Sequence, residues 1–369
     1  MSVKILPSAV HWFRLCRSGL VDPFASAPET ARRLVGVQAQ LPAAATLAFF
    51  HRTRNCTLRG LDAARLEHRT LVRFWGQRNT VHLYATADWP LLHAAFLDHH
   101  AVMKRRLEKA GLAGEFRRLR RRMLRRLEKG EQLTHKDASS PKLEGTQDQW
   151  RVSYVTFMTL VREGVVCHGQ EEGASARFVH REHWTPQLSW EPPSQQDALA
   201  ELTRRYLAGY GPATAHDLAF WYGTTLTRAK GWIQALGEEC IEVEVDGVTH
   251  WCLAGDLAVL RVKPPPASRW PARLLFRFDP LLLATRDKTW LIEAEHKRKV
   301  WAPSAQVEAV LLVRGRIAGT WRYERRAKVL RFRLQPFGAL TGPVKKKLTQ
   351  EAERIAAFLG FGSIELDMP

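Results

Sequence analysis

Cysteine is scarce in this 369-residue chain and follows no pattern. The number of cysteines is odd, they are scattered, and no two of them form a Cys-x-x-Cys pair. A disulfide framework is therefore excluded, and reduced thiols in a cytosol are expected. The five positions are Cys16, Cys56, Cys167, Cys240 and Cys252.

Long hydrophobic segments are also missing. The longest apolar run, residues 41–50, is too short to span a bilayer. Residues 1–14 are interrupted by Pro7, His11 and Arg14, which is not the pattern of a signal peptide. We therefore expect a cytoplasmic protein with no membrane partner.

Motifs for common cofactors and for covalent catalysis are absent too. No glycine-rich phosphate loop follows a predicted strand, and no Gly-x-Ser-x-Gly elbow occurs. His180 and His183 stand at the end of a predicted strand and lack convincing metal-ligand spacing. No pair of carboxylates stands at motif spacing. We expect no metal, no cofactor and no covalent Ser or Cys nucleophile.

Acidic residues are too few to balance the basic ones. Lys and Arg number 56 against 37 Asp and Glu, which gives a net charge of +19. Solubility does not need so much charge, so a polyanionic partner is favoured, nucleic acid before membrane. Hydrophobic residues make up 45% of the chain and charged ones 25%, so it is globular with room for two or three domains.

A pattern of helices followed by a hairpin occurs three times. The first hairpin joins strands 71–75 and 81–85, and the second joins strands 165–168 and 177–180. The third turns on Asp246-Gly247, the strongest short hairpin signal in the chain. Three such units predict tandem winged helices. The alternative is a mixed α+β protein with three unrelated hairpins.

Composition changes after residue 262. A proline-rich linker is followed by residues that alternate between apolar and charged, which predicts a small antiparallel sheet or barrel. Residues 345–359 are predicted to close the chain as an amphipathic helix. The fold class is therefore α+β, with three winged-helix units and a C-terminal β region. The predicted domains are residues 1–130, 131–190, 191–262 and 263–369.

An arginine-rich stretch, residues 115–130, lies within a region, residues 88–130, that is predicted to be mostly helical. Phe116, Leu119, Met123 and Leu127 form one apolar stripe at helical spacing, and arginines cover the rest of its surface. Like charges at this density repel one another unless an anion lies nearby, which favours contact with phosphate. A solvated helix face is the alternative. The candidate DNA contacts here are Arg118, Arg121, Arg122 and Arg125.

Two neutral amides lie between two predicted helices. Ser26 and Glu29 form a capping box for the first helix, and Pro42 suits the first turn of the second. Gln38 and Gln40 stand two positions apart, so they share a face only on an extended chain. If both amides point into one cavity, residues 37–41 must be a non-helical connector.

The order of several motifs resembles the winged-helix DNA glycosylases of the AlkZ/YcaQ type. The stretches, in chain order, are VGVQAQLPAA, RFWGQRNTVHLY, YGPATAHDLAFW, LGEECIEVEVDG, FRFDPLLLATRD and GRIAGTWR. The resemblance implies three tandem winged helices in a C-shaped scaffold with a basic channel. It also implies that Gln38 and Gln40 are the catalytic motif. A second Gln instead of Asp resembles the AlkZ branch, which is associated with self-resistance to DNA-alkylating natural products.

Two amides suit a substrate whose leaving group is already activated. Alkylation at N7 makes guanine cationic, so no general acid is needed, and the remaining barrier is positive charge on the deoxyribose. Amide dipoles stabilise such charge by roughly 2.7–4 kcal/mol each, and an amide also orients water. No lysine stands out as a Schiff-base nucleophile. We therefore expect a monofunctional DNA glycosylase for bulky N7-alkylguanine lesions, with interstrand crosslinks among its candidate substrates.

The resemblance extends to further positions with weaker support. Asn79, Thr80 and His82 are expected to line the channel, although His82 could equally pack under the first hairpin. Asp279 and Arg286 are expected either to contact DNA or to pair with each other. A further group near a hairpin tip is expected to enter a groove or hold phosphate. This group contains Arg322, Arg325 and Arg326.

The expected partner is double-stranded DNA carrying alkylated guanine, bound by a monomer. A non-enzymatic winged-helix regulator is the main alternative, because winged helices also read operator sequences. Three units in one chain favour a single clamp on a lesion over a symmetric dimer on two half-sites. A structural nucleoid protein or an RNA-binding protein is a third possibility.

Overall fold

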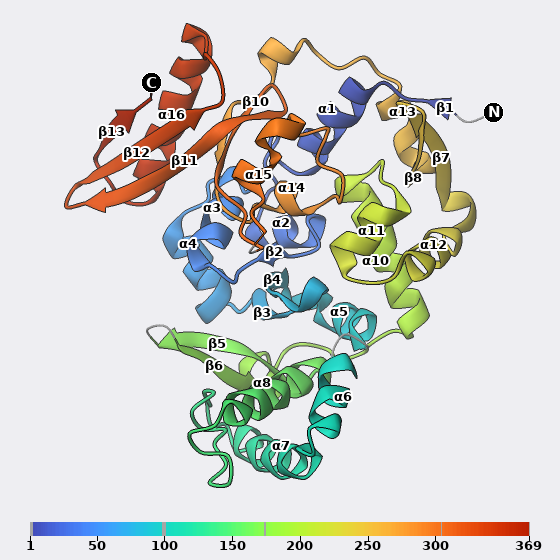
Figure 1. Ribbon diagram of the computed structural model, residues 1–369, viewed down its shortest axis with the longest axis vertical. Coiled ribbons are helices and arrows are strands. Elements are labelled where there is room, and N and C mark those ends of the chain that lie inside the picture. The colour runs from blue at the N-terminus through green and yellow to red at the C-terminus, as the bar shows by residue number, and fades with distance from the viewer. Residues whose placement is uncertain (1–2, 98–100, 173–174, 304, 369) are drawn as a thin grey trace. The chain divides into compact units, whose positions relative to one another are not determined.

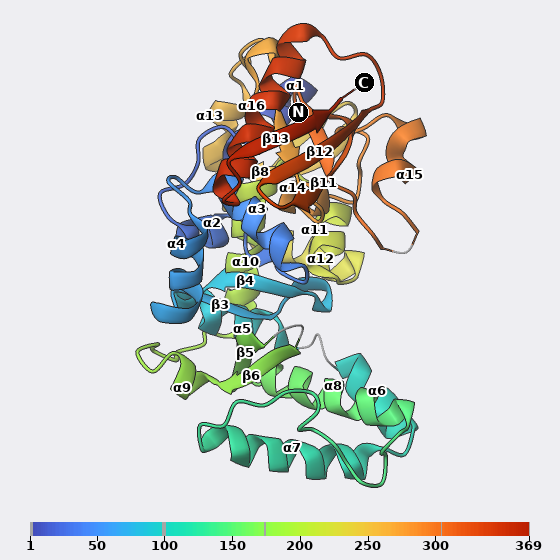
Figure 2. The same ribbon diagram turned by 90° about the vertical axis from the view of Figure 1, so that its left-hand side faces the viewer.

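The structure is a computed structural model that describes residues 3–97, 101–172, 175–303 and 305–368 (Figure 1, Figure 2). The chain separates into two compact units. The first contains Met1–Leu61 and Thr203–Pro369, and the second contains Asp62–Leu202. Both contain helices and sheet, in agreement with the predicted α+β class. The bounds of the four predicted domains stay predictions.

The N-terminal segment of the first unit is mainly helical. α1 (Pro7–Arg17) and α3 (Pro42–Arg52) both begin at proline, whose missing N–H has no intrahelical partner at that position. α2 (Ala27–Arg33) starts as predicted, because the Ser26 side chain accepts a hydrogen bond from the Glu29 amide. β2 (Val37–Gln38) lies between α2 and α3 in the chain. The other elements are β1 (Val3–Lys4) and α4 (Leu58–Asp62).

The third predicted hairpin is present in the first unit. Asp246 and Gly247 adopt φ values of 48° and 74°, the left-handed pair that a two-residue hairpin turn requires. β1 adds to β7 as a parallel strand, which the sequence did not predict. The elements are α10 (Gln195–Tyr210), α11 (Ala215–Tyr222), α12 (Leu226–Gln234), β7 (Cys240–Val245), β8 (Val248–Leu253) and α13 (Leu257–Leu260).

The C-terminal region is an open sheet in the order β13-β12-β11-β10-β9, so the barrel alternative is wrong. Four strands are antiparallel, but β13 runs parallel to β12. The reason is that α16 (Gly342–Phe358) carries the chain back to the end of the sheet at which β12 begins. Leu348 and Ile355 of α16 pack on the sheet. The strands are β9 (Arg273–Leu275), β10 (Val310–Val313), β11 (Arg316–Arg326), β12 (Val329–Pro336) and β13 (Ser363–Asp367).

The predicted sheet was too extensive between β9 and β10. This segment contains the short helices α14 (Pro280–Leu283) and α15 (Lys297–Val300), joined by irregular chain. Asp279 caps α14 and Pro280 follows it, so a helical turn replaces the expected strand. Apolar residues of this segment, such as Leu281 and Ile292, pack with Leu15 of α1 in one core.

The second unit contains a sheet in which β4, β3, β5 and β6 are neighbours. Arg73 of β3 pairs with His168 of β5, so the first two predicted hairpins belong to one sheet. β3 and β4 are buried almost throughout, unlike a solvated wing. The strands are β3 (Leu71–Trp75), β4 (Val81–Ala85), β5 (Val166–Glu172) and β6 (Ser175–His180).

The helices of the second unit match the predicted pattern. α7 (Ala113–Glu128) buries the predicted stripe of Phe116, Leu119, Met123 and Leu127. α8 (Gln147–Arg162) follows Thr146, whose side chain caps it by accepting a hydrogen bond from the Gln149 amide. The other helices are α5 (Trp89–Ala95), α6 (Ala101–Lys109) and α9 (Arg181–Trp184).

Candidate active site

The chain leaves α2 through a sharp left-handed turn before the two glutamines. The Gly36 amide donates to the Ala31 carbonyl at 2.7 Å, and the Val35 amide donates to the Arg32 carbonyl at 3.1 Å. These two bonds form a Schellman cap. Val35 has a φ of 51° and Gly36 has a φ of 94°. A β-branched residue in this region is a strained outlier of about 1–3 kcal/mol, and such strain is typical of functional sites.

The predicted non-helical connector is confirmed. Gln38 ends the short strand β2, Gln40 lies in a bend, and α3 begins at Pro42. Gln38 is 7% exposed, whereas Gln40 is exposed to solvent. Within the described residues, neither side-chain amide has a hydrogen-bond partner. Gln38 is therefore a buried amide with free hydrogen-bonding capacity. The meeting of both amides in one cavity stays a prediction.

Helices α2 and α3, which flank the connector, are also joined to each other by hydrogen bonds. The Thr30 hydroxyl of α2 lies 3.2 Å from the Arg52 carbonyl and 2.8 Å from the Thr53 hydroxyl. Thr30 is fully buried. The Phe24 amide also donates to the Arg52 carbonyl, at 2.8 Å. These bonds join α2 to the C-terminal end of α3, the end of that helix away from the connector.

Asp279 belongs to this framework, and not to a predicted pair with Arg286. Its two carboxylate oxygens accept hydrogen bonds from the Arg52 guanidinium at 2.7 and 2.8 Å. It also accepts from the Leu281 amide at 2.9 Å. Asp279 is 2% exposed and Arg52 is 0% exposed. The predicted Asp279–Arg286 pair is therefore replaced by a buried pair with α3, and an interior carboxylate has no access to DNA.

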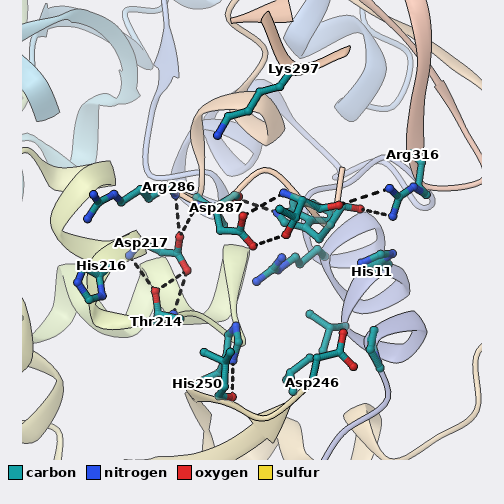
Figure 3. Close-up of a pocket in the computed structure, with 18 residues that line it drawn as sticks. His11, Thr214, His216, Asp217, Asp246, His250, Arg286, Asp287, Lys297 and Arg316 are labelled. Atoms are coloured by element: carbon teal, nitrogen blue, oxygen red, sulfur yellow. Dashed lines mark hydrogen bonds between the residues drawn. The ribbon is translucent and has the colours of Figure 1, made fainter. Parts of the chain in front are cut away.

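Arg286 lies elsewhere, on the wall of a cavity of about 780 Å³ in the first unit (Figure 3). Its backbone amide donates to Asp217 at 2.7 Å, while its side chain is exposed. Asp287 lines the same cavity. Asp217 and Arg14 also line this cavity, and neither was predicted from the sequence. The only local signal was a capping pattern, Thr214 with Asp217, which α11 uses.

The residues predicted from the first hairpin are held tightly in the second unit. Asn79 has a φ of 55°, and its side-chain oxygen accepts a hydrogen bond from Arg162 at 3.0 Å. The Thr80 hydroxyl donates to the Gln77 carbonyl at 3.1 Å. Asn79 and Thr80 are half-buried. Their predicted DNA contacts stay predictions.

His82 packs inside the second unit, which was the second of its two predicted roles. It is 2% exposed, and its Nδ1 lies 2.9 Å from the Thr80 carbonyl. Its ring lies 5.6 Å from that of Tyr84. Burial, and then the charge of Arg78, lowers the pKa of His82 from 6.5 to about 3. The imidazole is therefore neutral at physiological pH.

The arginines of α7 divide into partnered and unpartnered groups. Arg118 pairs with Glu115, and Arg122 donates to the Ser139 carbonyl. Two others, Arg120 and Arg126, pair with acidic side chains. Three exposed guanidinium groups have no partner among the described residues. They are Arg117, Arg121 and Arg125.

The third predicted basic group lies on the β11–β12 hairpin, drawn as a long ribbon in Figure 1. The hairpin turns after Arg326, and Ala327 has a φ of 42°. Arg322 lies 3.5 Å from Glu308, and Arg325 lies over the Phe361 ring at 5.8 Å. These arginines are exposed. Arg325 and Arg326 lie near the tip as expected, Arg322 lies further along β11 opposite Arg333, and their contact with DNA stays a prediction.

We searched the structure for clusters of metal ligands and for helices that could cross a membrane. Within residues 3–97, 101–172, 175–303 and 305–368, no group of three or more His, Cys, Asp or Glu is arranged to hold a metal ion. In the same part of the chain, no helix combines the length and apolarity that crossing a membrane requires. All five cysteines are free.

Known proteins provide independent comparisons. A curated protein of Streptomyces sahachiroi, described as an interstrand DNA cross-link repair glycosylase, is 28% identical over 166 residues. That alignment spans 44% of this chain and only 44% of the relative's own length. The solved structure of the S. sahachiroi DNA glycosylase AlkZ matches with a TM-score of 0.83 at 22% identity, over 100% of both chains. The fold is thus shared.

The match to a protein-family model shows the family of this chain. The family described as "DNA glycosylase AlkZ-like" matches residues 31–358, a span that includes both glutamines and nearly the whole of both units. The chain therefore belongs to the AlkZ-like DNA glycosylase family.

Proposed function

We propose that this protein is a monofunctional DNA glycosylase that hydrolyses the N-glycosidic bond of bulky N7-alkylguanine lesions, interstrand crosslinks included. It acts as a monomer on double-stranded DNA, through three tandem winged-helix units of which the first two share one sheet. Its biological role is DNA repair or self-resistance to a DNA-alkylating natural product. One observation carries the proposal: in a family of DNA glycosylases, Gln38 is a buried, unpartnered amide on a non-helical connector.

The surroundings of Gln38 suit stabilisation of a developing cation. An amide dipole in a water-poor site acts more strongly than in bulk water, and one that is already oriented needs no rearrangement during the reaction. Gln38 is 7% exposed, and the Schellman cap and Pro42 hold the chain on either side of it. We assign the Gln38 carbonyl to the deoxyribose C1′.

Gln40 has the complementary role in this proposal. It is exposed, so water reaches its amide. An amide both donates and accepts hydrogen bonds, which orients a water molecule but does not deprotonate it strongly. Such a weak catalyst is sufficient for a cationic, labile N7-alkylguanine and insufficient for a neutral, stable base. We therefore expect little release of undamaged bases.

The test is base release from duplex DNA treated with alkylating agents of different bulk, followed by chromatography. Gln38→Ala and Gln40→Ala are compared singly with the wild type. Loss of one oriented dipole lowers the excision rate by about 10²–10³-fold. Gln350→Ala is the matched control, because Gln350 is an exposed glutamine of α16 in the same unit.

Circular dichroism and thermal melting establish that each variant is folded. Wild-type excision in both connector variants would eliminate the assignment. Footprinting on undamaged DNA separates the main alternative, since a defined operator sequence indicates a regulator, and binding without sequence preference indicates the enzyme.

A further inference from the structure

A cavity in the first unit contains charge that the proposed glycosylase site does not use. Its volume is about 780 Å³, within the range of small-ligand sites. Its walls come from α1, the start of α11, the β7–β8 turn, the segment after α14, α15 and the start of β11. Figure 3 shows Lys297 and Arg316 approaching it from different walls.

Arg14 is a buried cation without a direct ion pair in the wall of this cavity. It is 4% exposed, and its Nη2 donates to the Pro212 carbonyl at 2.5 Å. Its guanidinium lies over the Trp290 ring at 4.5 Å. The Nε has no acceptor, and no carboxylate forms an ion pair with Arg14 among the described residues. A buried guanidinium normally has an anionic partner, because desolvation of its charge is costly.

Three carboxylates line the cavity, and two of them, Asp217 and Asp287, are engaged in holding the backbone, while Asp246 is exposed on the β7–β8 turn. Asp217 accepts from the Thr214 amide at 3.0 Å and hydroxyl at 2.8 Å, and from the Arg286 amide at 2.7 Å. Asp287 accepts from the Thr289 amide at 3.0 Å and hydroxyl at 2.6 Å. These acids shape the cavity and only partly offset the charge of Arg14.

Further positive charge surrounds the opening. Arg316 is tied to Glu293 at 2.6 Å. Lys297 and Arg286 are exposed, and their side chains have no hydrogen bond or ion pair among the described residues. Burial, and then the charges of Arg14 and Arg316, lowers the pKa of His11 from 6.5 to about 4, so this imidazole in the cavity wall is neutral.

We infer that this cavity binds a phosphate group, with Arg14 behind the anion and Lys297 and Arg286 at the opening. The volume exceeds that of one phosphate, so the cavity has room for a group attached to the phosphate. Two sources share this chemistry: a phosphodiester of bound DNA, and a free phosphorylated small molecule such as a nucleotide. Val10 and Val248 provide apolar wall for the attached group.

The first arm of the test uses free ligands. The full-length protein is titrated with inorganic phosphate and with guanosine monophosphate at constant ionic strength, by calorimetry. For a free ligand, saturable binding weakens about tenfold in Lys297→Gln, the loss of one charge-assisted hydrogen bond. Lys299→Gln is the matched control, since Lys299 is an exposed lysine of the same helix that does not line the cavity.

The second arm measures duplex DNA affinity against salt concentration and rests on the proposed DNA binding. If the occupant is a phosphodiester of DNA, Lys297→Gln binds duplex about tenfold more weakly than the wild type. The slope of log K against log salt concentration falls by about 0.9, and binding of free phosphate does not saturate. For a free ligand, duplex affinity is unchanged. This arm measures binding and not base excision. A negative result for the phosphate site is therefore independent of the result for Gln38→Ala.

Arg14→Gln tests the buried cation directly, and its thermal melt shows whether it folds. If it does not fold, Lys297→Gln and Arg286→Gln decide the outcome. The inference is overturned if both opening variants match Lys299→Gln in phosphate, nucleotide and duplex binding.

Discussion

At the scale of single residues, hydrogen-bond partners distinguish a structural polar side chain from a candidate catalytic one. Gln38 and Asp279 are both buried, yet Asp279 is saturated by Arg52 and the Leu281 amide, whereas Gln38 has no partner among the described residues. A saturated carboxylate holds elements together. A free amide in a largely buried residue has its hydrogen-bonding capacity available for a substrate.

Asp279→Asn is therefore expected to affect stability and not DNA recognition. Removing one charge of a buried pair leaves the Arg52 guanidinium uncompensated and costs about 3–5 kcal/mol. Urea unfolding of the variant is compared with that of Asp22→Asn, an exposed aspartate of the same unit. If Asp279 instead contacted DNA, the variant would keep its urea midpoint and bind duplex more tightly, because a negative charge is lost.

At the scale of elements, α7 presents a row of arginines at helical spacing. Arg117 and Arg125 are eight residues apart, so the row is about 12 Å long. Their guanidinium groups, with that of Arg121, have no partner among the described residues, whereas Arg118 and Arg122 have theirs. The row is the part of α7 most available to a phosphate backbone.

The double variant Arg121→Gln/Arg125→Gln is expected to weaken duplex binding more than Arg118→Gln/Arg122→Gln. Both remove two charges at the same spacing, so the second is a matched control. Loss of two phosphate contacts lowers the slope of log K against log salt by about 1.8. Fluorescence anisotropy over a salt series measures both slopes. Equal slopes in the two variants would mean that α7 contributes only general charge.

At the scale of the whole molecule, neutral histidines inside the fold make stability depend on pH. His82 and His168 are 2% and 4% exposed. Burial is the largest cause that lowers the pKa of each below 6.5, to about 3 for His82. Neither ring nitrogen of His168 has a hydrogen-bond partner among the described residues.

Stability is expected to fall as the pH drops below about 6.5. Below that pH the unfolded chain binds protons that the folded chain does not, so each such histidine costs about 1.4 kcal/mol per pH unit. His168→Phe, which keeps an aromatic ring against Trp75 and Phe178, should flatten the dependence between pH 6.5 and 5. Melting temperatures over this range measure it, with the exposed His68→Phe as control. An unchanged slope in His168→Phe would contradict the assignment.

The features that could be predicted from the sequence are those set by neighbours along the chain. The Ser26 cap, Pro42 and the Asp246-Gly247 turn define their elements through local hydrogen bonds and allowed φ values. The stripe of α7 follows from helical periodicity. For this reason the sequence by itself is sufficient to locate the connector around Gln38 and the arginine helix.

The features that could not be predicted depend on residues that meet only in three dimensions. Arg52 and Asp279 are 227 positions apart, and no local pattern distinguishes a buried partner from a DNA contact. The β3–β5 pairing, the parallel β13 and the cavity around Arg14 are of the same kind. Local preferences are summed over a few residues, whereas the partner of a buried charge or strand edge is chosen by the packing of the complete unit.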